Sequence, residues 1–84
     1  MENKGLVELY IPTIEKKYEL FLPVGKRIGD IVFLISKALT DIGGGYYIVT
    51  ETERLYSRIT GKAYDENQIL KNTDIRNGSQ LILM

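Results

Sequence analysis

The sequence has 84 residues, and a chain of this length is expected to form a single domain over residues 1–84. Eleven Lys and Arg residues balance eleven Asp and Glu residues, so no net charge attracts nucleic acid or an anionic membrane surface. The sequence has no Cys and no His, which excludes disulfides, Cys and His nucleophiles and histidine general bases.

The chain carries no signal for membrane insertion or export. Its longest unbroken apolar run, residues 31–35, is far shorter than the about 20 residues that a membrane-spanning helix needs. The first five residues are mostly polar and lack the apolar core of a signal peptide. We therefore expect a soluble cytoplasmic protein with no membrane insertion.

Two stretches near the N-terminus alternate with a period of two, which is typical of strands. The first covers residues 6–11, and the second follows Lys16 and Lys17 and is closed by Pro23. The short polar link between them predicts a hairpin, and the charges of the second strand suit the edge of a sheet. The side chains expected to face the core from this hairpin are Val7, Leu9, Ile11, Tyr18, Leu20 and Leu22.

From about Arg27 the apolar residues recur with a period of 3.6, which predicts one amphipathic helix. Leu34 flanks its apolar stripe, and the glycines at positions 43–45 are expected to end the helix, because glycine adopts the left-handed C-cap conformation without strain. The stripe consists of Ile28, Ile31, Val32, Ile35, Ala38, Leu39 and Ile42.

Three further strands are predicted in the second half of the chain. Residues 46–50 are β-branched and aromatic, and residues 54–60 form a strand with Leu55 and Ile59 on one side. Residues 81–84 are apolar at both parities, which favours the centre of a sheet.

The segments between these strands are predicted to be turns and irregular structure. Gly61 and Lys62 turn the chain, and Asn77-Gly78 is a strong turn signal. Residues 63–76 are irregular and polar, with three apolar side chains expected to close the end of the core: Ile69, Leu70 and Ile75.

The predicted order of elements is β-β-α-β-β-β, and it defines an α+β domain with two layers. One helix packs on a mixed four- to five-stranded sheet, with the last strand placed parallel to the first. This arrangement is the β-grasp.

The residues resemble ubiquitin-like domains over nearly the whole chain. Residues 20–24 (Leu-Phe-Leu-Pro-Val) followed by residues 28–31 (Ile-Gly-Asp-Ile) are similar to the family's entry into its helix. Residues 70–83 resemble the family's C-terminal pattern of Leu70, a five-residue step to Ile75, a polar turn and a closing Leu-x-Leu strand. The resemblance implies the ubiquitin-like β-grasp fold.

Within that superfamily, residues 55–67 and 75–78 are most similar to the small bacterial YukD/EsaB family. Proteins of that family accompany the WXG100, or type VII, secretion apparatus of Gram-positive bacteria. The resemblance implies a non-catalytic accessory or regulatory protein that binds other proteins, with components of the secretion apparatus as candidate partners.

Two alternatives remain open at this point. Some small effector subunits of bacterial multicomponent oxygenases are also ubiquitin-like and of this length. A sulfur carrier or protein modifier is disfavoured, because those proteins use a flexible Gly-Gly tail, whereas this chain stops at Met84 within an apolar strand.

No motif in the sequence supports catalysis, a cofactor or a metal. The three glycines at positions 43–45 follow the predicted helix, whereas a phosphate-binding loop precedes one. Asp65, Glu66 and Asn67 lack the ligand spacing, sixth-position glycine and distal Glu of a calcium loop. We therefore expect a protein that is not an enzyme, with no catalytic, cofactor-binding or metal-binding residues.

Arg54, Tyr56 and Arg58 share one parity and form a basic stripe with an aromatic between the two arginines. Such a stripe can bind single-stranded nucleic acid. Because the chain has no net positive charge, we interpret the stripe as a solvated outer face and expect no nucleic-acid partner.

The apolar residues at outward parity exceed what a free monomer normally exposes, which indicates a protein partner or a homodimer through the open sheet face. The outward parity of residues 47 and 49 requires that Ile48 point inward, and the sequence leaves this open. Phe33 forms a second candidate on the outer surface of the helix. The residues predicted to bind a partner are Leu6, Tyr10, Phe21, Tyr47, Val49, Ile82 and Phe33, with Met84 also at outward parity.

Overall fold

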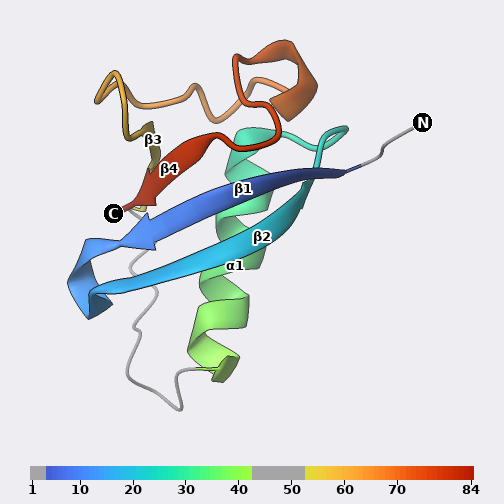
Figure 1. Ribbon diagram of the computed structural model, residues 1–84. Coiled ribbons are helices and arrows are strands. Elements are labelled where there is room, and N and C mark those ends of the chain that lie inside the picture. Colours follow the sequence, from blue (N-terminus) through green and yellow to red (C-terminus); the bar gives the residue numbers. More distant parts are fainter. Residues whose placement is uncertain (1–3, 43–52) are drawn as a thin grey trace.

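The N-terminal alternation produces the predicted hairpin. The computed structural model describes residues 4–42 and 53–84, and in it β1 (Lys4–Ile11) pairs antiparallel with β2 (Lys16–Pro23) (Figure 1). A short 3₁₀ turn over Pro12–Ile14 joins the strands, and Glu15 closes it in the left-handed region at φ 52°. Proline suits the first position of such a turn because its φ is already close to the helical value.

The described strands form one mixed sheet in the order β2-β1-β4-β3. β4 (Gln80–Leu83) runs parallel to β1 and antiparallel to β3 (Leu55–Ser57), so it lies inside the sheet as its apolar composition predicts. β2 lies at the edge, as its charged side chains predict. The β-grasp topology is confirmed.

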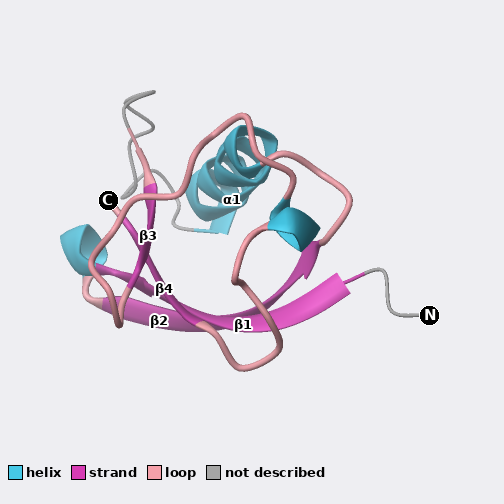
Figure 2. Ribbon diagram, turned by 90° about the horizontal axis from the view of Figure 1, so that it is seen from above, coloured by secondary structure: helices cyan, strands magenta, loops and turns pink. Residues whose placement is uncertain are grey.

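The helix α1 (Ile28–Ile42) covers one face of this sheet, and the sheet curves around it (Figure 2). The hairpin side chains of predicted inward parity face α1: Val7, Leu9, Ile11 and Leu22 are buried, and Tyr18 and Leu20 pack partly buried against them. Of the predicted helical stripe, Ala38 lies exposed at its flank. The remaining buried apolar residues of the core are Ile28, Ile31, Val32, Ile35, Leu39, Leu55, Leu70, Ile75, Leu81 and Leu83.

The N-terminus of α1 is held by the irregular segment that precedes β4. The backbone N–H of Ile28 donates to the carbonyl of Gln68 at 2.9 Å, and that of Gly29 donates to the carbonyl of Glu66 at 3.0 Å. These bonds satisfy two N–H groups that have no partner inside a helix. A Cβ at position 29 would lie 3.3 Å from the Glu66 carbonyl oxygen, so glycine permits this close approach.

The predicted strand over residues 54–60 is too long, and the prediction that Ile59 lies on the same side of it as Leu55 is wrong. β3 ends at Ser57, and Ile59 is 82% exposed in the turn that follows. The Ser57 carbonyl accepts a hydrogen bond from the Gly61 N–H at 2.8 Å, and Gly61 has φ +74°. Because the chain turns within these few residues, alternation cannot continue to Ile59.

Two predictions fall on residues 43–52, which lie outside the described residues: the glycine helix end at 43–45 and the strand over 46–50. The other segments agree with prediction. Leu70 and Ile75 close the core, Ile69 is half-buried beside them, and Gly78 has φ +87° in the turn before β4.

α1 has 15 residues, and no helix among residues 4–42 and 53–84 has the length and apolar character needed to cross a bilayer.

The hydroxyl of Tyr64 links the segment after β3 to the loop before β4, donating a hydrogen bond to the Asp74 carboxylate at 2.8 Å. Burial raises the pKa of Tyr64 from its ordinary value of 10.0 to about 12, and the hydrogen bond to Asp74 contributes to the rise, against a smaller lowering by Ser57. Both main causes favour the neutral phenol in the folded state.

Because the pKa of Tyr64 is higher when folded, its contribution to stability is fully present below pH 10.0 and is lost as pH rises toward about 12. Urea unfolding should therefore show the native chain losing stability relative to Tyr64→Phe across this interval. The phenylalanine variant carries the same remaining tyrosines, so it controls for their titration. A constant difference between the two proteins across the same interval would contradict the assignment.

Truncating a core side chain from α1 or β4 should destabilise the fold strongly. We expect Ile31→Ala, Ile35→Ala and Leu83→Ala each to lower the free energy of unfolding by about 2–4 kcal/mol, through lost burial and a cavity. Phe33→Ala is the matched control on α1, because Phe33 is 64% exposed and its loss should cost less than about 0.5 kcal/mol. Denaturation midpoints that are unchanged in all three core variants would contradict this packing.

Candidate protein-binding surfaces

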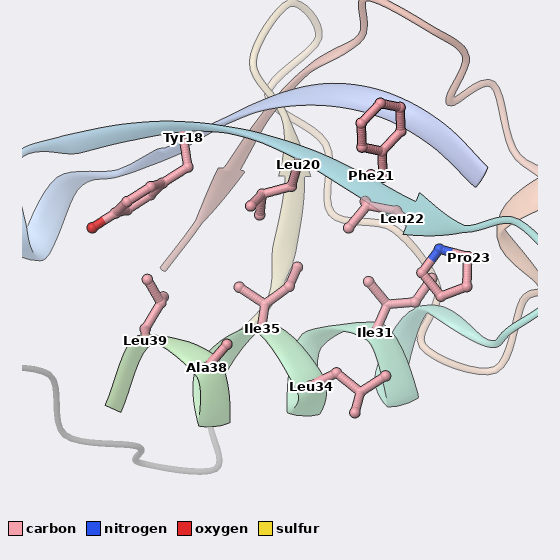
Figure 3. A pocket seen from close by; sticks show the side chains of 10 residues that line it. All are labelled: Tyr18, Leu20, Phe21, Leu22, Pro23, Ile31, Leu34, Ile35, Ala38 and Leu39. Atoms are coloured by element: carbon pink, nitrogen blue, oxygen red, sulfur yellow. The ribbon is translucent and has the colours of Figure 1, made fainter. Parts of the chain in front are cut away.

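The predicted partner-binding residues of the sheet lie on its open face, opposite α1. Leu6, Tyr10 and Ile82 alternate with buried neighbours and are themselves half-buried. Phe21 is 66% exposed and points away from α1 (Figure 3). Met84 is 53% exposed. The predicted parity of β1, β2 and β4 is therefore confirmed.

Strand register brings some of these side chains into one row. Tyr10 lies opposite Ile82 in the parallel pair, and Ile82 lies opposite Tyr56 in the antiparallel pair of β3 and β4. Residues directly opposite on one face of a sheet are near neighbours. The aromatic–aliphatic row Tyr10, Ile82 and Tyr56 thus crosses three strands.

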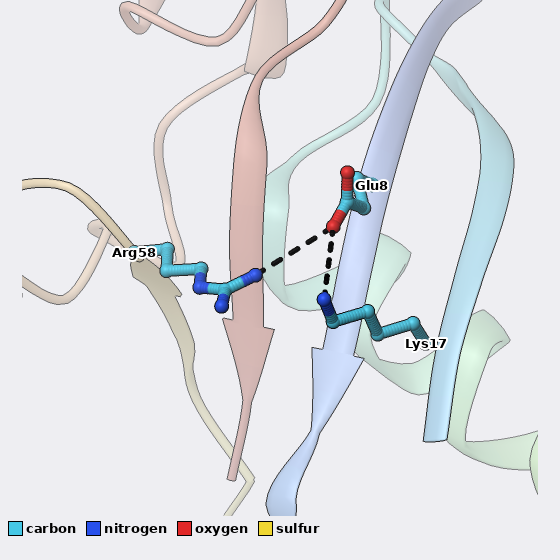
Figure 4. Close-up of polar contacts among 3 residues, drawn as sticks. All are labelled: Glu8, Lys17 and Arg58. Carbon is cyan, nitrogen blue, oxygen red and sulfur yellow. Dashed lines mark ion pairs between the residues drawn. The ribbon is translucent and has the colours of Figure 1, made fainter. Parts of the chain in front are cut away.

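A charged row separates this aromatic–aliphatic row from the remaining apolar side chains of the face. Glu8 lies opposite Glu19 on β2 and opposite Gln80 on β4. The Glu8 Oε1 atom is 3.8 Å from Lys17 Nζ and 3.6 Å from Arg58 Nη1 (Figure 4). On the other side of this row, Leu6 lies opposite Phe21.

Among the described residues, the apolar side chains of the open face therefore fall into two areas with charges between them. The physical reason is the register. Alternation assigns Glu8, Glu19 and Arg58 to the same face as the apolar residues, but cross-strand pairing decides that they align across the middle of the sheet.

The predicted basic stripe is partly neutralised on this face. The guanidinium of Arg58 lies over the Tyr10 ring, 5.7 Å from its centroid, and also reaches Glu8. Arg54 forms an ion pair with Glu66. Both arginines thus have partners within the protein.

The remaining predicted residues are not brought into this surface. Phe33 is 64% exposed on the outer side of α1, away from the sheet. Tyr47 and Val49 lie outside the described residues. In residues 4–42 and 53–84 no group of three or more Asp or Glu side chains could hold a metal ion.

An apolar groove lies between α1 and β2, and the sequence did not predict it. It has a volume of about 260 Å³ and opens at the edge of the sheet (Figure 3). Tyr18, Leu20 and Leu22 point into it from β2, and Leu34, 47% exposed, flanks it on α1. The signal in the sequence was the pair Leu34 and Ala38, which widens the helical stripe toward one side. The groove is lined by Tyr18, Leu20, Phe21, Leu22, Pro23, Ile31, Leu34, Ile35, Ala38 and Leu39.

No protein-family model and no curated protein sequence matches this chain. Solved structures do. The ubiquitin-like domain of Plasmodium falciparum Dsk2 is 15% identical, with a TM-score of 0.71 over 95% of each chain. A chain of an ESX-5 inner membrane complex is 13% identical, with a TM-score of 0.73, covering 99% of this chain and 21% of that one.

A chain of the toluene 4-monooxygenase HD complex is 2% identical, with a TM-score of 0.75 over 95% of each chain. At such low identities these likenesses concern the fold. Together with the topology, they define a ubiquitin-like β-grasp fold with one helix on a mixed sheet.

Proposed function

We propose that this chain is a non-catalytic ubiquitin-like accessory or regulatory protein of a bacterial type VII (WXG100) secretion system, similar to the YukD/EsaB family. It acts in the cytoplasm by binding other proteins and not by conjugation. The observation that carries the proposal is the match of 99% of this chain to part of a chain in an ESX-5 inner membrane complex. The resemblance of residues 55–67 and 75–78 to the YukD/EsaB family adds to it.

The open sheet face supports action by binding. Its aromatic–aliphatic row combines two tyrosines with Ile82, and tyrosine is enriched at the energetic centres of protein interfaces. The ion pair of Glu8 and Arg58 lies beside the row. Charges at the border of an interface help to select and orient a protein partner. Around Met84 the backbone is held in the sheet, since Met84 and Arg54 exchange hydrogen bonds of 2.8 and 3.2 Å.

The second candidate is a small effector subunit of a bacterial multicomponent oxygenase. It is favoured by the likeness to a chain of the toluene 4-monooxygenase HD complex, which spans 95% of both chains. The two candidates share a binding role and differ in the partner. Identification of the bound protein therefore separates them.

Affinity capture of the tagged full chain from its native host, read by mass spectrometry, tests the proposal. We expect enrichment of a secretion ATPase or of membrane components of the type VII apparatus. Enrichment of oxygenase hydroxylase subunits instead would establish the second candidate and overturn the first.

Substitutions on the open face should weaken that capture. Tyr10→Ser and Ile82→Ser remove large side chains from the aromatic–aliphatic row, and such losses at an interface centre cost about 1–2 kcal/mol or more, about tenfold in affinity. Phe33→Ser is the contrasting probe, an equally drastic change at the second candidate surface on the outer side of α1. Loss of binding in Phe33→Ser alone, with both sheet variants binding normally, would place the partner on the helix. Circular dichroism of each variant verifies that the fold is retained.

A further inference from the structure

The outer edge of β2 is a free strand edge in the described part of the sheet. β2 has one strand neighbour, β1. The outer side of β3, in contrast, is covered by its own chain: the Ser57 N–H donates to the Lys62 carbonyl and the Tyr64 N–H donates to the Leu55 carbonyl, each at 2.9 Å. An unpaired edge presents N–H and C=O groups that can accept a further strand.

The charges of β2 restrict which strand can be added. Lys17 and Glu19 are both exposed on the open face, with Tyr18 between them facing α1. On the neighbouring strand β1, the like-charged Glu8 lies directly opposite Glu19. Glu19 has no ion pair within residues 4–42 and 53–84. Like charges in directly opposite positions destabilise a sheet. A strand that places a cation beside Glu19 is therefore favoured.

We propose that the strand added to this edge is β2 of a second copy of this chain, antiparallel to the first about a twofold axis at Tyr18. In that register Lys17 lies opposite the partner's Glu19, and Glu19 lies opposite the partner's Lys17. The symmetry of the pair thus makes both contacts complementary at once. Each Glu19 gains a cation that the described residues of its own chain do not provide. This interface at the sheet edge is separate from the partner-binding face of the proposed function and does not depend on it.

The same charges disfavour neighbouring registers. An axis at Glu19 sets the two Glu19 carboxylates against each other and Lys17 against the partner's Phe21. An axis at Leu20 sets Lys17 against the partner's Pro23 and leaves both charges without an opposite charge. Side-chain direction alternates along a strand, so a twofold axis that passes through a residue pairs side chains of the same sheet face. Charge on β2 therefore favours the register with its axis at Tyr18 over those with an axis at Glu19 or Leu20.

The groove between α1 and β2 supports the same occupant. A twofold axis normal to the sheet keeps both helices on one face, so the two grooves adjoin across the new strand pair. Tyr18 of each copy then lies beside the other at the open side of the groove, near the short side chain of Ala38. Leu34 and Ala38, which are exposed in the single chain, face this junction. Self-association thereby covers apolar surface as well as pairing charges.

Sedimentation equilibrium of the full chain tests the proposal. We expect reversible dimerisation of the native chain between micromolar and millimolar concentration. Lys17→Glu alone creates two Glu–Glu contacts and Glu19→Lys alone creates two Lys–Lys contacts, so each should weaken self-association about tenfold or more. Lys62→Glu makes the same charge change in the segment that covers β3, and it should dimerise like the native chain.

A mixture of the Lys17→Glu and Glu19→Lys variants gives the sharpest result. Across the interface between the two different chains, each position 17 again faces an opposite charge at position 19. The mixture should therefore form a heterodimer more tightly than either variant self-associates. Its formation also shows that both variants are folded. A native chain that stays monomeric at millimolar concentration overturns the proposal. So does a dimer that these charges leave unchanged, or one abolished by Tyr10→Ser on the open face.

Discussion

The pairing of β1 with β4 is the contact on which the rest of the structure depends. Leu9 lies opposite Leu81, two residues far apart in sequence, and both are buried. This parallel pair places β4 inside the sheet and provides the neighbour to which β3 attaches. Without it, the N-terminal hairpin would have one apolar face and no third strand, and isolated hairpins are marginally stable in water.

The same closure positions the helix. The irregular segment before β4 carries the carbonyls of Glu66 and Gln68 to the N-terminus of α1, where they accept two otherwise unpaired N–H groups. Leu70 and Ile75 from that segment enter the core beside the helix. The polar stretch over residues 63–76 therefore contributes to the fold both through its backbone and through a few apolar side chains.

Surface chemistry in this fold follows from which strand lies beside which. The central charged row of the open face joins Glu19, Glu8 and Arg58 from three different parts of the chain. It divides the apolar side chains into a Phe21–Leu6 area and the aromatic–aliphatic row. At the sheet edge, β2 combines alternating charge on one face with an apolar groove on the other. β2 thus contributes to two surfaces of different chemistry, the open sheet face with its charges and the apolar groove beside α1.

The sequence by itself determined the α+β class, the amphipathic helix, the hairpin, the interior place of the last strand and the inward parity of residues such as Val7 and Leu22. Periodicity and composition are local properties, and they suffice for these. Only the tertiary structure decided that β3 ends at Ser57, that Ile59 is exposed, that charges divide the open face and that a groove lies beside Ala38. These features depend on cross-strand register and on the spacing of helix and edge strand. Both are set by contacts between residues distant in sequence, which no local pattern encodes.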